Sequence, residues 1–222
     1  MQRANRENKG SGGGPSEGRP ARTSSTMSGH STKSGFDFTA AIRDIVFDMT
    51  ERLPALSHID PTRVAFSFAQ TRSNSQYGTY ASLTPLRFEN GSKVKKKSGR
   101  KWAVQPVRDE QGREMLYILT VYLPRFQNLT FNQKLTTIVH ELFHISPHCD
   151  GDLRRFGGRC YAHTGSQKKY DAAMAHHAAQ WLAMDPPAEL YSFLELDFST
   201  LAAAYGRVHG TKVAAPKSFA IG

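Results

Sequence analysis

The sequence predicts an α+β domain, and three observations support this fold class. An amphipathic helix pattern opens the folded part of the chain, several strand-like segments follow it, and further helical patterns come after the strands. Helices that precede and follow a group of strands, without alternating with single strands, are typical of α+β proteins. We therefore expect an N-terminal helix, a mixed sheet of about three to four strands, and C-terminal helices.

Four segments have strand patterns. Residues 64–69 alternate between larger and smaller side chains, which predicts a half-buried strand. Residues 77–88 form a second strand pattern that is interrupted at Pro85, and proline there favours the edge of a sheet. A third strand is expected around 102–107. The nearly all-apolar segment 115–123 predicts a central strand that is covered on both faces.

Helical patterns flank these strands. Asp37 is suited to cap a first helix, which Pro54 ends. A long helix is expected at 166–184, followed by shorter helical patterns at 187–196 and 198–205.

The two ends of the chain are predicted to be tails. Residues 1–35 are rich in Gly, Ser, Arg and Asn and hold almost no large apolar side chains. Such a segment cannot bury enough apolar surface to offset the entropy of ordering, so we expect a disordered basic tail, within which Met27 is an alternative start. The folded domain is expected over 36–205, and a flexible C-terminal tail over 206–222.

The most specific motif is His140-Glu141-Leu142-Phe143-His144. Thr130 and Gln133 have the spacing of a capping box, and apolar residues then recur at helical spacing, so the motif is expected on a helix. Two imidazoles four residues apart on a helix share one face, where both can bind Zn²⁺ with the glutamate beside an open coordination position. The pattern predicts His140 and His144 as metal ligands. Glu141 is then the general base on a zinc-bound water in peptide hydrolysis.

A catalytic zinc ion needs a third protein ligand, which must come from outside the motif helix. His163 is our first candidate, because the loop that precedes the next predicted helix can fold back over the motif. Asp150 and Asp152 are alternatives, although Asp-Gly-Asp is also typical of a turn, or of carboxylates that orient the ligand rings. The remaining alternatives are His148, His176 and His177.

The two cysteines, Cys149 and Cys160, do not form a disulfide framework. With His148 and His163 they offer an alternative structural metal site, but their spacing matches no common zinc finger. The sequence has no apolar run of the length of a membrane span and no secretory signal, so we expect a cytoplasmic protein with no membrane partner.

The net charge of +10 is concentrated in two segments. Residues 1–35 contribute +4 and residues 93–101 contribute +6, whereas the rest of the chain holds 17 basic and 17 acidic residues. A basic cluster such as Lys93–Lys101 can neutralise phosphates and bind nucleic acid without sequence preference. A solvated charged loop is the alternative interpretation.

The motif and its surroundings resemble the phage metallopeptidase family. The resemblance covers roughly residues 40–182. Its most specific part consists of the segments 140–147 and 150–156, His163 and Lys169-Tyr170-Asp171. The segments Tyr77–Ala81 and Leu86–Phe88 resemble the upstream part of the family. It implies a small zincin-like (minigluzincin or SprT-like) domain of phage or prophage origin in the bacterial host cell. A more distant resemblance is to SprT-like and Spartan proteases, which act on protein attached to DNA. The chain lacks the Cys-x-x-Cys ribbon found in many of them.

Two other functions stay open at this point. One is a DNA-associated phage accessory protein with a structural or vestigial zinc site, and the other is a regulatory protease that cuts a single repressor or toxin partner. For a peptidase, an extended substrate is expected to pair with the edge strand at 77–88. Candidates for stabilising the oxyanion are Arg154, Arg155 and Tyr161.

Overall fold

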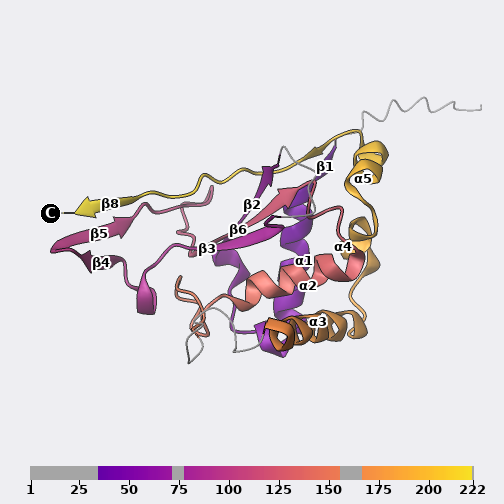
Figure 1. Ribbon diagram of the computed structural model, residues 1–222. Helices are drawn as coiled ribbons and strands as arrows, with labels where there is room; N and C mark the ends of the chain where they lie inside the picture. The colour runs from indigo at the N-terminus through magenta and orange to yellow at the C-terminus, as the bar shows by residue number, and fades with distance from the viewer. Residues whose placement is uncertain (1–34, 72–77, 156–166, 222) are drawn as a thin grey trace, which may run out of the picture. The chain divides into compact units, whose positions relative to one another are not determined.

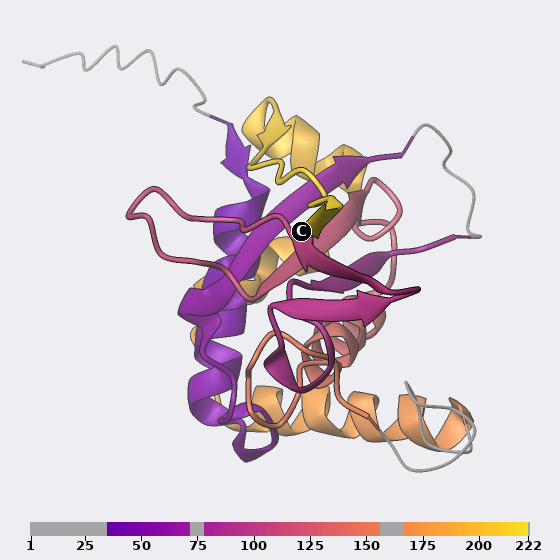
Figure 2. The ribbon, with the colours of Figure 1, turned by 90° about the vertical axis from the view of Figure 1, so that its left-hand side faces the viewer.

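A three-stranded mixed sheet, in the order β2-β6-β3, lies at the centre of the fold (Figures 1 and 2). The computed structural model describes residues 35–71, 78–155 and 167–221. Strand β6 (Tyr117–Leu123) is the middle strand, parallel to β2 (Val64–Gln70) and antiparallel to β3 (Ala81–Pro85). The predictions of a covered central strand and of an edge strand that includes Pro85 are both confirmed.

Helices α1 and α2 pack against this sheet, and α3 packs on α2. Helix α1 (Phe38–Arg52) begins at Asp37, whose side chain accepts a hydrogen bond from the backbone N–H of Ala40 at 3.0 Å, as predicted. Helix α2 (Phe131–Phe143) begins with the predicted capping box, and α3 (Gln167–Ala183) matches the long helix expected at 166–184. Their apolar faces and the strands share one continuous core.

The charged segment around residues 93–101 is a β-hairpin and not a loop. Strands β4 (Val94–Lys97) and β5 (Arg100–Val104) pair through a two-residue turn at Ser98 and Gly99, both with positive φ. Positive φ at both central residues is the geometry of the turn that matches the twist of a hairpin.

The C-terminal segment, expected as a flexible tail, carries two short strands. Strand β7 (Val208–His209) pairs in parallel with β1 (Phe36–Asp37), and β8 (Ser218–Ile221) pairs with β5. Between them, the backbone N–H of Phe68 in β2 donates to the carbonyl of Thr211 at 3.1 Å. These hydrogen bonds join parts of the chain that are far apart in sequence, so local composition did not reveal them.

Two buried side chains of the α2 region hold the chain after Tyr191: Lys134 donates to the carbonyls of Leu194 and Leu196, and Gln127 donates to those of Phe193 and Leu196.

Among the described helices, none combines the length and the apolar character that a membrane span requires. The short elements are α4 (Ala188–Tyr191), α5 (Phe198–Tyr205) and the 3₁₀ turns Pro54–Leu56, Pro61–Arg63, Glu89–Gly91 and Ser192–Glu195. The described part of the chain is therefore an α+β fold, as predicted.

Candidate functional site

The two histidines of the motif lie next to each other on α2. Leu135, Ile138 and Leu142 are buried in the core, which leaves His140 and His144 half-buried on the other side of the helix. Their ring centroids are 4.8 Å apart, and the ring planes are 76° to one another. This is the pairing that the four-residue spacing predicts.

The helix ends at this pair. His144 is the C-cap residue of α2, and its carbonyl accepts a hydrogen bond from the backbone N–H of Arg154 at 2.7 Å. The Arg154 side chain donates to the carbonyl of Phe143 at 2.8 Å and lies 4.2 Å from the centroid of the Phe143 ring. Arg154 therefore fixes the end of the motif helix, a role that sequence reasoning did not identify when it named this residue as an oxyanion candidate.

Tyr170, on α3, packs against both imidazoles. Its ring centroid is 5.1 Å from that of His140 and 6.2 Å from that of His144, and its side chain is almost completely buried. Burial raises the pKa of the Tyr170 hydroxyl to about 12, so the phenol stays neutral at physiological pH. Sequence reasoning placed Tyr170 on the apolar face of this helix but did not connect it with the histidines.

Glu141 faces the edge strand of the sheet. Burial raises the pKa of its carboxyl to about 7, and a hydrogen bond from the backbone N–H of Leu83 in β3 opposes that rise. A cavity of about 600 Å³ opens beside Glu141 and His140. Residues of β3 and of the segment just before it, with the outer faces of α2 and α3, line this cavity: Gly78, Thr79, Tyr80, Ala81, Leu129, Asn132, Gln133, Thr136, Thr137, Asp171 and Ala175.

The Asp-Gly-Asp segment after the helix is a turn. The Asp150 carboxylate accepts hydrogen bonds from the Ser146 hydroxyl at 2.6 Å and from the backbone N–H of Asp152 at 3.1 Å. Asp152 is buried and forms an ion pair with Arg155 at 2.9 Å. The hydroxyl of Tyr117 in β6 donates to the carbonyl of Asp152 and accepts from the N–H of Gly151, both at 2.9 Å. These contacts tie the loop to the sheet and occupy the side chains that were alternative ligands.

The other candidates from the sequence lie apart from the pair or outside the described residues. His148 is exposed on the loop, and His176 is exposed on α3. The ring of His177 stacks on Phe143 with a centroid distance of 5.9 Å, and Cys149 lies beside the backbone of Asp60. Outside the described residues lie His163, Cys160, Tyr161 and the 1–34 segment.

The chemistry of the paired imidazoles fits a zinc ion. Imidazole nitrogen is a preferred zinc ligand, and both rings lie on one helix face beside an open cavity. Among the residues that the structure describes, no group of three or more His, Cys, Asp or Glu side chains is arranged to hold a metal ion. His140 and His144 are thus the two candidate donors that the described residues bring together on α2.

Comparison with known proteins agrees with the resemblance seen in the motif. The model of the family described as Putative phage metallopeptidase matches residues 39–177, which is more than half of the chain. The matched range includes the central sheet, α2 and all of α1 except its first residue. No curated protein and no solved structure gives a significant match. The matched range and the paired histidines within it lead to one assignment: the chain belongs to this family of phage metallopeptidases.

Proposed function

We propose that this protein is a zinc-dependent metallopeptidase with a zincin-like fold that hydrolyses peptide bonds in a protein substrate in the cytoplasm of the bacterial host. The observation that carries the proposal is the arrangement on α2. Two imidazoles with centroids 4.8 Å apart flank a half-buried Glu141, whose carboxylate lies against the edge strand of the sheet. A candidate general base, paired metal donors and an open strand edge together support metal-assisted peptide hydrolysis.

His140 and His144 are the proposed metal ligands, and His163 remains our proposal for the third. Tyr170 lies in the first turn of α3 and contacts both imidazoles, so the chain enters α3 close to the pair. His163 precedes Gln167 by four residues, which an extended chain spans in about 14 Å. His163 is therefore within reach of the two rings.

Glu141 is the proposed general base. When bound, zinc supplies Lewis-acid polarisation of the scissile carbonyl and makes a water molecule more acidic. The Glu141 carboxylate takes the proton of the attacking water and passes it to the nitrogen of the leaving amine. Burial holds the pKa of this carboxyl at about 7 in the metal-free protein, and a dication bound beside it would favour the ionised form that accepts the proton.

The outer edge of β3 is the proposed binding position for the substrate backbone. The carbonyl of Tyr80 accepts a hydrogen bond from the N–H of Tyr122 in β6, so Tyr80, Ser82 and Thr84 direct their backbone groups toward β6. Ala81 and Leu83 consequently direct theirs away from the sheet. An extended peptide that pairs with this edge passes along the cavity beside Glu141.

Replacement of the base tests the proposal. Glu141→Gln keeps the shape of the side chain, so we expect the zinc content, measured by elemental mass spectrometry, to be unchanged. Because the amide cannot act as the base, we expect the variant to lose cleavage of a diverse peptide library. If the wild-type protein is a regulatory protease with a single partner, it would leave casein intact and cut that partner. Its Glu141→Gln variant should no longer cut the partner. Cleavage by Glu141→Gln at the wild-type rate would refute the assigned base. A zinc-loaded wild type that cuts neither the peptide library nor host and phage proteins would favour a structural zinc site.

Metal analysis of a matched pair of variants tests the third ligand. We expect His163→Ala to lose stoichiometric zinc and His148→Ala to retain it, because His148 is exposed on the loop beyond the helix end. Retention of zinc by His163→Ala would overturn the assignment of His163.

A further inference from the structure

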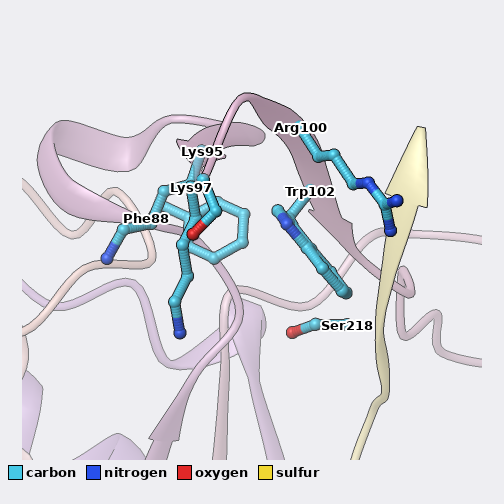
Figure 3. Close-up of a pocket in the computed structure, with 7 residues that line it drawn as sticks. Phe88, Lys95, Lys97, Arg100, Trp102 and Ser218 are labelled. Carbon is cyan, nitrogen blue, oxygen red and sulfur yellow. The ribbon is translucent and has the colours of Figure 1, made fainter. Parts of the chain in front are cut away.

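A second cavity lies on the sheet of β4, β5 and β8, on a face that is basic and aromatic. Directly paired residues of an antiparallel sheet share a face, and Lys95 pairs with Trp102 while Lys97 pairs with Arg100. Ser218 pairs with Val104, two residues from Trp102, and therefore lies on the same face. These side chains and Phe88 line a cavity of about 570 Å³, within the range of small-molecule sites (Figure 3).

The opposite face of the same sheet carries Lys96 and Lys101, which pair with each other. We name the first face, with Lys95, Lys97, Arg100 and Trp102, the Trp102 face. Each face has two neighbouring lysines, so removing either pair changes the charge of the hairpin by the same amount. The pair on the opposite face therefore serves as a charge-matched control for the pair on the Trp102 face.

The cations of the Trp102 face are not neutralised within the described part of the chain. No carboxylate there lies within ion-pair distance of Lys95, Lys97 or Arg100. The nearby acid Glu114 already pairs with Arg87 at 2.7 Å and approaches Lys93 at 3.8 Å. Three positive charges thus surround the cavity and favour an anionic ligand.

Two aromatic rings complete the cavity. Figure 3 shows Phe88 and Lys97 on one side and Trp102, Arg100 and Ser218 on the other. Trp102 is half-buried, whereas the second tryptophan of the chain, Trp181, is fully buried and donates to Asp48. A ligand with a planar apolar group could place that group between the two rings. If the ligand also carries several negative charges, these would lie against the cations of the Trp102 face.

We propose that the Trp102 face binds single-stranded nucleic acid, with one base against the Trp102 indole and backbone phosphates on Lys95, Lys97 and Arg100. Base stacking on an aromatic side chain inside a basic groove is how proteins bind single strands without sequence preference. A duplex keeps its bases stacked on one another and offers none to the cavity. An acidic peptide would supply the negative charges but has no planar base on each residue to place against Trp102. A hairpin that inserts into a membrane would need apolar residues at its tip, and the tip of this hairpin consists of Ser98 and Gly99.

Titration of the full-length protein with an oligothymidylate of about ten nucleotides tests the proposal. We expect the nucleic acid to quench tryptophan fluorescence, because Trp102 is the tryptophan that solvent and ligand can reach. Three phosphate contacts predict a slope of about −2 in a plot of log K against log salt concentration. Because variants of Trp102 lack the fluorescent reporter, their affinity is measured from the fluorescence anisotropy of a dye-labelled oligothymidylate. Trp102→Leu should weaken binding about tenfold, whereas Trp102→Phe, which keeps a ring for stacking, should retain most of the wild-type affinity.

The two faces give the decisive comparison. Lys95→Ala/Lys97→Ala should reduce the magnitude of the salt slope by about 1.4, whereas Lys96→Ala/Lys101→Ala, which removes the same charge from the opposite face, should leave the slope nearly unchanged. Binding of either oligothymidylate or oligouridylate supports the proposal. Equal losses in the two double variants, an unchanged affinity in Trp102→Leu, or equal affinity for a duplex or for polyglutamate would overturn it.

Discussion

Replacing Lys134 with methionine should destabilise the protein more at alkaline than at neutral pH. The Lys134 side chain is only 1% exposed, and its ammonium group donates to the carbonyls of Leu194 at 2.8 Å and Leu196 at 2.7 Å. Burial lowers the pKa of this ammonium from 10.5 to about 8. The folded protein therefore holds the proton of Lys134 less tightly than the unfolded chain does.

The sign of the pH effect follows from proton binding. Between about pH 8 and 10.5 the unfolded chain binds more protons at this site than the folded protein, so the free energy of unfolding rises with pH. From about pH 7.5 to 9.5 the rise amounts to about 2 kcal/mol. Lys134→Met has no proton to release and loses this rise. It also leaves the carbonyl of Leu194 without the nitrogen donor of Lys134 at both pH values, which costs about 1–3 kcal/mol.

Urea unfolding followed by circular dichroism, at both pH values, measures this difference. Tyrosines and other lysines also titrate toward alkaline pH, so the quantity of interest is the difference between wild type and variant, in which their contributions cancel. Lys168→Met on the exposed surface of α3 is the matched control and should show the same small difference at both pH values. A penalty for Lys134→Met that does not grow with pH would refute the argument from burial.

Three further predictions concern the helix start, the loop and the histidine pair. Thr130→Ala removes the hydroxyl that caps α2 and should lower the free energy of unfolding by about 1 kcal/mol; an unchanged value would contradict the capping box. Gly151→Ala should cost about 1–3 kcal/mol, measured by the same unfolding assay, since Gly151 has a φ of 92° and an added Cβ would lie 2.5 Å from Cγ of Arg87. Tyr170→Leu removes the ring that packs on both imidazoles and should weaken zinc binding in a chelator competition; a zinc affinity equal to that of the wild type would contradict this packing role.

Local patterns in the sequence were sufficient to predict the elements that form the frame of the candidate site. Asp37 and Thr130 mark helix starts because each side chain accepts a hydrogen bond from the backbone N–H three residues further on. A contact of this kind depends on only a few neighbouring residues, so the local sequence is enough to predict it. The covered strand β6 follows from a run of apolar residues. The four-residue spacing placed His140 and His144 on one face for the same reason.

Contacts between distant parts of the chain were not predictable in this way. Arg154 bonds to the end of α2 and Tyr170 packs on the two imidazoles because the fold brings α3 and the loop onto α2. The pairing of β8 with β5 turns a composition typical of a loose tail into a strand. In each case the local sequence permits several conformations, and the partner that selects one lies many residues away.

The backbone N–H of Leu83 connects the proposed base with the proposed substrate edge. It donates to the Glu141 carboxylate, yet it is also one of the backbone groups that β3 directs away from the sheet. A peptide that pairs with β3 at this position therefore competes with Glu141 for the same donor. Since a backbone N–H makes one strong hydrogen bond, pairing at Leu83 would remove an interaction that lowers the pKa of Glu141 and would make the carboxylate a stronger base. On this argument the edge strand does more than align the substrate, because its occupation also frees the base, and a peptide bound away from Leu83 would meet a carboxylate that is still hydrogen-bonded to β3.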